Sequence, residues 1–323
     1  MDHQWILNAL QKIHVGAFEF NLKARDPLVL PAYKGSTLRG GFGYAFKKVV
    51  CALKNQDCPA CLLKEKCLYS YVFETPPPAN TRIMRKYKAA PHPFIIEPPL
   101  ERQRIYKPGA EFQFGLILIG RAIDYLPYFI YTFDELGRTG IGKGKAGFDL
   151  VSVNCNGDQI YDSQTKTLKP IDIPQPGVER SLPFSLQPSA LCLSFLTPTR
   201  IQYNEHLTLD LEFHILVRNL LRRLSLLYYF HCNGDPSNWD FKGMIEKAKE
   251  VKVKKENLRW YDWERYSGRQ ETRMKMGGFV GEITFEGEIE PVIPLIRMGE
   301  VLHVGKGTSF GLGKYEIRED VRE

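Results

Sequence analysis

The sequence predicts an α+β fold made of two similar halves, and three observations support this. The tripeptide Gly-Lys-Gly at 142–144 recurs at 305–307 after a shift of 163 residues. An apolar segment of helical length precedes each tripeptide and a strand-like segment follows it. A proline-rich stretch, 169–188, contains five prolines and lies between the halves. Repetition at a fixed offset indicates a duplicated unit.

Each half begins with a strand followed by a helix. In the first half Phe18, Phe20 and Leu22 alternate with polar residues, as in a half-buried strand. Ser36 then offers an N-cap for a helix whose apolar residues continue at helical spacing to Val49. This first half predicts a strand and a helix in direct succession.

The second half repeats this pattern. Residues 190–201 are typical of a strand, 209–234 of a helix with Asn233 and Gly234 as its stop signal, and 277–288 of a further strand. The order of strand, helix, strands, helix, glycine loop and strand is that of a ferredoxin-like (RRM-like) unit. We therefore predict two such domains, 1–170 and 189–323, joined by a linker at 171–188. Sheets of this class also serve as RNA-recognition surfaces.

Composition restricts the class of protein. The chain has 323 residues, of which 43% are hydrophobic, a net charge of +7 and a pI near 8.9. This basic excess suits a polyanionic partner. No apolar run reaches the roughly 18 residues of a membrane span, and the first 15 residues lack a signal-peptide pattern. We expect a cytoplasmic protein without membrane contact.

The glycine-rich stretch 299–317 resembles a phosphate-binding loop, but its spacing does not fit a nucleotide site. A Walker loop has four residues between its glycines and then Lys-Ser/Thr, whereas five separate Gly299 from Gly305 and Gly307 follows Lys306. The third glycine of a dinucleotide motif is replaced by Phe310. The sequence therefore predicts no nucleotide cofactor and leaves a nucleic-acid backbone as the source of phosphate.

A cysteine-rich insertion at 51–67 predicts a metal site. Cys51, Cys58, Cys61 and Cys67 follow the spacing C-x6-C-x2-C-x5-C. Four thiolates close the coordination sphere of a structural zinc ion, and an iron–sulfur cluster is the alternative metal group. The alternative interpretation is a cysteine-rich loop that binds no metal and keeps its thiols reduced. The other three cysteines are scattered and are interpreted as ordinary thiols.

Three stretches of the chain resemble a known superfamily, the repeat-associated mysterious proteins (RAMPs). The segment YKGSTLRGGFGYAFKKV, 33–49, resembles the start of their first helix. The cysteine insertion followed by YSYVFETPPP is similar to one subgroup with cysteines after that helix. The ending HVGKGTSFGLGKYEI, 303–317, resembles the glycine loop of the CRISPR-associated endoribonucleases that process repeat RNA, the Cas-six group.

The resemblance spans the whole chain and implies binding and cleavage of CRISPR repeat RNA, with other CRISPR-associated proteins as further partners. It implies metal-independent attack of a ribose 2′-hydroxyl on the adjacent phosphate, which leaves a 2′,3′-cyclic phosphate. Expected RNA contacts are Arg39, His303, Gly305, Lys306, Gly307, Thr308, Ser309, Gly311, Gly313 and Lys314.

The catalytic base departs from the family pattern. Many members have a histidine in or beside the first helix, but residues 31–50 contain none. We therefore expect Lys34 and Lys47 to stabilise charge on the phosphate and Tyr33 to orient the 2′-hydroxyl or relay its proton. His92, between two prolines, is interpreted as a loop residue.

Two other functions remain open. A non-catalytic RNA-binding RAMP subunit of a CRISPR effector complex would share the fold and the glycine loops. A zinc-dependent scaffold without an RNA role would share only the cysteine cluster. Cleavage of repeat RNA distinguishes the first from the enzyme, and salt-sensitive RNA binding distinguishes both from the scaffold.

Overall fold

The computed structural model describes residues 4–54, 57–78, 80–83, 89–170, 190–267 and 272–318. The chain divides into two compact units: an N-terminal unit, 15–173, and a C-terminal unit made of 174–323 together with 1–14. The predicted linker, 171–188, lies outside the described residues.

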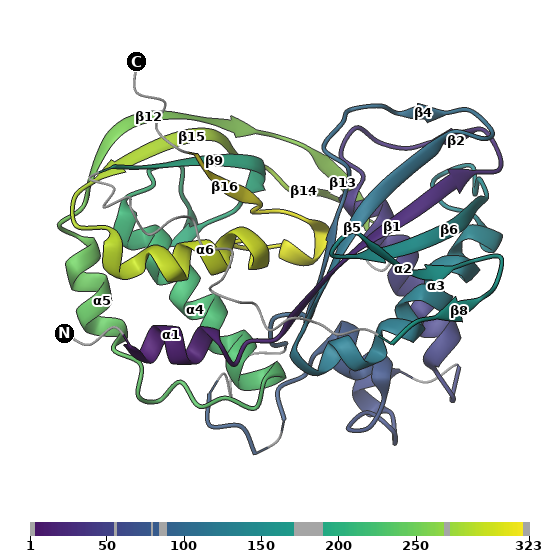
Figure 1. Cartoon of the computed structure of the whole chain (residues 1–323), viewed down its shortest axis with the longest axis horizontal. Coiled ribbons are helices and arrows are strands. Elements are labelled where there is room, and N and C mark those ends of the chain that lie inside the picture. The colour runs from purple at the N-terminus through teal and green to yellow at the C-terminus, as the bar shows by residue number, and fades with distance from the viewer. Residues whose placement is uncertain are drawn as a thin grey trace. The chain divides into compact units, whose positions relative to one another are not determined.

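The N-terminal unit is built on a six-stranded antiparallel sheet with the strand order β3-β5-β1-β6-β7-β8 (Figure 1). Its strands are β1 (Val15–Ala24), β3 (Phe94–Glu97), β5 (Glu111–Ile119), β6 (Phe148–Cys155), β7 (Asp158–Asp162) and β8 (Thr167–Leu168). The helices α2 (Gly35–Val50) and α3 (Leu126–Thr139) complete the order β1-α2-β3-β5-α3-β6. That order, with β1 and β5 central, is ferredoxin-like.

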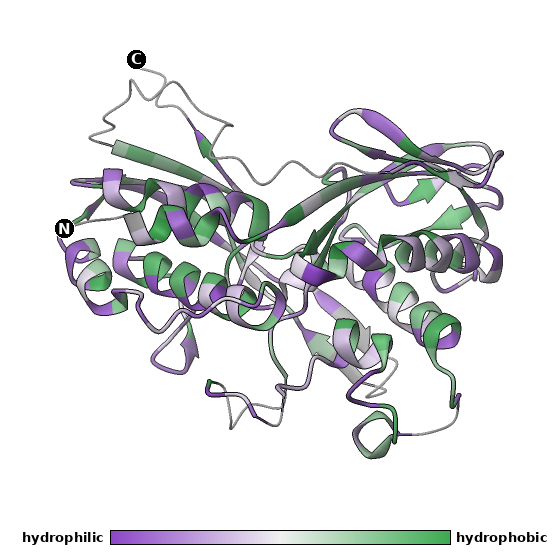
Figure 2. Cartoon of the chain, turned by 60° about the horizontal axis from the view of Figure 1, so that its bottom comes forward, coloured by the Kyte–Doolittle hydropathy of each residue, from purple (hydrophilic) through white to green (hydrophobic). Residues whose placement is uncertain are grey.

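Alternating apolar residues of β1 bury one face of this sheet beneath both helices. Phe18, Phe20 and Leu22 are buried, as their spacing predicts. The ring of Phe20 lies 5.2 Å from that of Phe133 on α3, which in turn lies 5.3 Å from Phe42 on α2. The helices carry alternating apolar and polar bands (Figure 2), as expected for helices that bury one side.

The C-terminal unit repeats this topology. Its sheet has the order β12-β15-β9-β16, in antiparallel register. The elements are β9 (Ala190–Thr199), α4 (Phe213–His231), β12 (Lys252–Tyr261), β15 (Gly278–Glu286), α6 (Ile293–Leu302) and β16 (Tyr315–Arg318), with α5 (Phe241–Ala248) added after α4. The predicted fold of two ferredoxin-like domains is confirmed.

Residues 1–14 group with the C-terminal unit, although the sequence analysis placed them in the first domain. The short helix α1 (Gln4–Leu10) packs beside α6, and Trp5 contacts Trp239 at 5.3 Å between ring centres. The apolar contacts of α1 therefore place residues 1–14 with the C-terminal unit, although they come first in the chain.

The remaining strands form two-stranded ribbons: β2 (Leu28–Val29) with β4 (Ile105–Tyr106), β10 (Gln202–Tyr203) with β11 (His206–Leu207), and β13 (Glu264–Ser267) with β14 (Thr272–Lys275). Short 3₁₀ helices lie at Cys58–Ala60, Gly120–Tyr125, Glu290–Val292 and Thr308–Phe310, and a short π-helix at Ser70–Glu74. Within the described ranges, no helix has the length and apolar character needed to cross a bilayer.

Candidate nucleic-acid interface

The glycine-rich loop connects α6 to β16 in the C-terminal unit. Its glycines at 305, 307, 311 and 313 all have φ between 75° and 85°, a region that other residues rarely adopt. A Cβ at Gly313 would lie 1.8 Å from the carbonyl oxygen of Val304, and one at Gly305 would lie 2.6 Å from that of Arg200. The turn itself therefore requires these two glycines.

The loop exposes a short segment. Lys306 is exposed and its glycine neighbours are half-buried, whereas residues 308–313 are buried. The amide of Gly311 donates to Thr308 O at 2.8 Å and that of Gly313 to Pro198 O at 3.2 Å. These two amides are used inside the protein, as is the amide of Lys306, which donates to Arg200 O at 2.9 Å. A phosphate would therefore approach the exposed turn at 305–307 chiefly through the ammonium group of Lys306.

His303 does not face solvent, contrary to its expected contact with RNA. The residue is fully buried, has φ 58°, and its Nδ1 lies 3.0 Å from Leu312 O. Its ring therefore ties the start of the loop to its far side. Nearby, the buried Arg223 of α4 donates from Nε to Leu302 O at 2.7 Å, and burial lowers the pKa of its guanidinium to about 9.

The first catalytic candidate, Lys34, is a structural residue. It is the N-cap of α2, in place of the predicted Ser36, and its side chain is completely buried. Its Nζ donates to Glu101 O at 2.8 Å and lies 3.4 Å from the Glu101 carboxylate, which also accepts from the Tyr106 hydroxyl at 2.5 Å. Lys34 thus fixes the segment before β4 and has no access to a substrate.

The other two candidates lie apart. Burial and the Glu97 carboxylate raise the pKa of Tyr33 well above its usual value, which keeps the phenol protonated. Lys47 occupies the last turn of α2, 13 residues beyond Lys34 and therefore about 20 Å along the helix axis. Its Nζ lies 5.5 Å from the centre of the Tyr69 ring. The three side chains do not assemble into one site.

The structure instead brings Arg39 and His92 together. Arg39 Nη2, on the second turn of α2, lies 3.2 Å from His92 Nε2 in the segment before β3. The Thr75 hydroxyl donates to Ala90 O at 2.8 Å and lies 3.4 Å from His92 Nδ1. Because that hydroxyl proton is already used, Nδ1 donates to Thr75 and Nε2 accepts from Arg39. The network therefore holds a neutral imidazole with its lone pair at Nε2.

The ring of Phe73 contacts both Arg39 and His92. The Arg39 guanidinium lies 4.0 Å from the centre of the Phe73 ring, and the His92 ring stacks on Phe73 and Phe94 at 6.0 and 5.6 Å. Phe73 reaches α2 because Gly43 has no side chain, since a Cβ there would lie 2.1 Å from the ring. The absence of a side chain at Gly43 therefore makes room for the Phe73 ring, which contacts the guanidinium of Arg39.

Two family models divide the chain at the same place as the fold. A model described as an N-terminal domain matches residues 13–173. The model of the CRISPR-associated endoribonuclease Cas6 matches 193–315, which includes α4, α6 and the exposed Lys306 turn. Residues 193–315 thus resemble the Cas6 family in sequence. The resemblance to this group and the RAMP-like fold are thereby confirmed, while the four-cysteine subgroup stays a prediction.

Whole-chain similarities agree with this. An uncharacterised protein of Archaeoglobus fulgidus is 24% identical over 293 residues, which are 90% of this chain and 93% of that protein. A Cas6 product complex superposes with a TM-score of 0.57 at 15% identity, covering 94% of this chain and all of the other. Thermus thermophilus Cas6 gives 0.54 at 16% identity, covering 95% and 99%. At these identities the structures show a shared fold.

The basic excess of the chain lies in the N-terminal unit. Residues 15–173 contain 22 Lys and Arg against 15 Asp and Glu, whereas the rest of the chain contains 22 of each. Attraction of a polyanion therefore depends more on the N-terminal unit than on the C-terminal unit.

The cysteine insertion follows α2 in the N-terminal unit. All four cysteines are half-buried free thiols, and burial raises the pKa of Cys58 while nearby Lys47 opposes this. Among the described residues, no three His, Cys, Asp or Glu side chains are arranged to hold a metal ion. This arrangement gives the zinc site no support, and zinc binding stays a prediction from the spacing.

Proposed function

We propose that this protein binds CRISPR repeat RNA and cleaves the precursor transcript, without a catalytic metal, through attack of a 2′-hydroxyl on the adjacent phosphate. The observation that carries the proposal is the match of residues 193–315 to the Cas6 model, in which the α6–β16 loop presents Lys306 between two glycines with left-handed backbones. Small residues let a phosphate approach the backbone, and the ammonium group supplies the charge.

The fold similarity to a Cas6 product complex supports an RNA substrate. Similarity to a Cas6-RT-Cas1–Cas2 complex, of whose matched chain this protein covers 47%, makes other CRISPR proteins candidate partners. The basic N-terminal unit would add electrostatic attraction.

We assign the base to His92. Its Nε2 lone pair would take the proton of the 2′-hydroxyl while the 2′-oxygen bonds to phosphorus, and the 5′-oxygen would leave with a proton from water. Arg39, now 3.2 Å from Nε2, would turn its guanidinium toward the phosphate, where its charge opposes that of the phosphorane. The products are a 2′,3′-cyclic phosphate and a 5′-hydroxyl.

A specific observation favours the second candidate, a non-catalytic RNA-binding RAMP subunit. Of the three residues expected to act in catalysis, Lys34 is buried in an ion pair and Lys47 lies a helix length away. Such a subunit would keep the glycine loop and the basic charge, and would bind repeat RNA without cutting it.

One experiment separates the two candidates. End-labelled repeat RNA is incubated with the protein in a chelator, in parallel with RNA that carries a 2′-deoxy substitution at each candidate cleavage position. The enzyme should cut the unmodified RNA, and one substitution should abolish the cut. Binding without any cut would support the non-catalytic subunit, and a cut that needs added metal would contradict the proposed chemistry.

A further inference from the structure

The N-terminal unit contains a shortened counterpart of the glycine-rich loop. The turn between α3 and β6, residues 140–147, occupies the same topological position as the α6–β16 loop: after the second helix and before the last strand of the four-stranded core. The C-cap of α3, Gly140, has φ 83° and ψ 156°, and that of α6, His303, has φ 58° and ψ 168°. The two helices therefore end in the same unusual backbone conformation.

The next residues also correspond. Ile141 exchanges backbone hydrogen bonds with Ala146 at 2.9 and 3.1 Å, and Val304, in the equivalent position, donates to Gly313 O at 3.0 Å. The glycines that follow, 142 and 305, have φ 77° and 85°. A Cβ at either would lie close to a backbone carbonyl, of Val29 or of Arg200 respectively. The N-terminal turn thus keeps the entry of the loop and closes four residues sooner.

The tip of this turn presents two lysines to solvent. Lys143, Gly144 and Lys145 are all exposed. In the part of the chain that the structure describes, neither lysine side chain forms an ion pair or a hydrogen bond. Lys143 occupies the position that Lys306 holds in the other loop, and Lys145 adds a second ammonium group.

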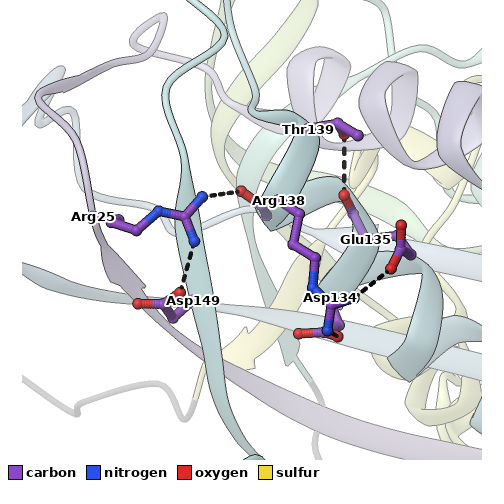
Figure 3. A network of polar contacts seen from close by, with 7 residues as sticks. Arg25, Asp134, Glu135, Arg138, Thr139 and Asp149 are labelled. Atoms are coloured by element: carbon purple, nitrogen blue, oxygen red, sulfur yellow. Dashed lines mark hydrogen bonds and ion pairs between the residues drawn. The ribbon is translucent and has the colours of Figure 1, made fainter.

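Three carboxylates near this turn pair with arginines (Figure 3), and a fourth, that of Asp26, accepts from the amide of Gly147 at 2.8 Å. Arg25 donates to Asp149 at 3.1 Å and to Gly137 O at 3.2 Å, close to the end of α3. Arg138 contacts Asp134 at 2.6 Å and Glu135 at 2.7 Å. These contacts hold the nearby acidic side chains in interactions within the unit, whereas the two exposed lysines have no such partner among the described residues.

We infer that the turn at 140–147 is a second RNA-backbone contact, in which Lys143 and Lys145 each bind a phosphate. The inference rests on the proposed RNA-binding function and extends it to the unit that carries the basic excess. Each lysine that neutralises a phosphate of a single strand contributes about 0.7 to the slope of log affinity against log salt. The turn would therefore contribute a slope of about 1.4.

Gly144 provides a sharp test because a Cβ there has no atom within 4 Å. Gly144→Asp places a negative charge between the two lysines without steric conflict, and Gly144→Asn is its neutral, equally sized control. The companion variant is Lys143→Ala with Lys145→Asn, since asparagine tolerates the φ of 48° at position 145. Lys166→Asn, at an exposed turn lysine of the same unit with φ 53°, is the matched control for loss of charge.

Binding of labelled single-stranded repeat RNA is measured by fluorescence anisotropy across a salt series, with thermal midpoints to confirm folding. We expect Gly144→Asp and the double lysine variant to weaken binding on the order of 10-fold, and the double variant to reduce the salt slope by about 1.4, while both controls bind like the parent. Equal losses in Lys166→Asn would show a general charge effect and overturn the inference. The inference would also be overturned if the double variant bound RNA like the parent while Lys306→Ala bound it weakly. That outcome would leave the proposed function intact. A parent protein that binds no RNA would overturn the proposed function itself.

Discussion

Arg39 and His92 come from segments more than 50 residues apart, yet Nη2 of the first lies 3.2 Å from Nε2 of the second. The Thr75 hydroxyl, which donates its own proton to Ala90 O, fixes the proton of the imidazole at Nδ1. A neutral histidine beside a guanidinium combines a proton acceptor with a cation, which are two of the groups that 2′-hydroxyl attack needs.

His92→Ala should therefore slow cleavage of repeat RNA by about 10²- to 10⁴-fold, the range for one removed acid–base group. RNA affinity should change little, because the imidazole is neutral and adds no charge. Single-turnover rates and anisotropy on the same protein measure both quantities. Thr75→Val, which removes the hydroxyl that accepts from Nδ1, should shift the pH–rate profile. Full cleavage by His92→Ala would remove His92 from the mechanism.

Lys34→Met should lower stability rather than chemistry. The buried ammonium group bridges the backbone and the carboxylate of Glu101, and removing it leaves the Glu101 carbonyl without that donor. We expect a loss of about 1–3 kcal/mol in the free energy of unfolding, measured by urea denaturation. Lys48→Ala, at an exposed position of the same helix, should change it by less than about 0.5 kcal/mol. A stable Lys34→Met protein that no longer cleaves would restore Lys34 to the catalytic site.

The fold was predictable because its signals are local and repeated. The buried stripe of α4, with Phe213, Leu216 and Leu220 among its members, follows from helical spacing, and the shift of 163 residues pairs the two turns that end α3 and α6. The place of residues 1–14 was not predictable, because the contact of Trp5 with Trp239 joins distant parts of the chain.

The site was less accessible to sequence reasoning. Spacing shows that Lys34 lies at the start of a helix, but its burial depends on Glu101, 67 residues away. The first helix contains no histidine, and His92, which the sequence places in a loop, reaches Arg39 only through the fold. The segment Pro91-His92-Pro93 gave one usable signal, a histidine in a rigid backbone directly before a buried strand.

Elemental analysis tests the zinc prediction, which rests on spacing alone. We expect about one zinc per chain in freshly purified protein, as a closed four-thiolate site holds one ion. Cys58→Ser with Cys61→Ser should lose the metal and lower the thermal midpoint, whereas Cys155→Ser, a buried thiol on β6, should keep the metal. Protein with neither zinc nor iron would leave the insertion as a loop of reduced thiols.

The two glycine turns also differ in what their glycines do, and stability measurements can show this. A Cβ at Gly313, where φ is 75°, would lie 1.8 Å from the Val304 carbonyl oxygen, whereas a Cβ at Gly144 meets no atom within 4 Å. Gly313→Ala should therefore cost about 2 kcal/mol or more in the free energy of unfolding, from the left-handed backbone and the displaced carbonyl. Gly144→Ala should cost almost nothing.

RNA binding by these alanine variants separates structural from contact roles. Because the Gly313 amide already donates to Pro198 O, Gly313→Ala should weaken RNA binding only as far as it distorts the exposed Lys306 turn. At temperatures well below its thermal midpoint, the salt slope of Gly313→Ala should therefore equal that of the parent. A reduced slope in a folded Gly313→Ala protein would mean that RNA contacts the buried half of the loop, and the interface would have to be extended beyond 305–307.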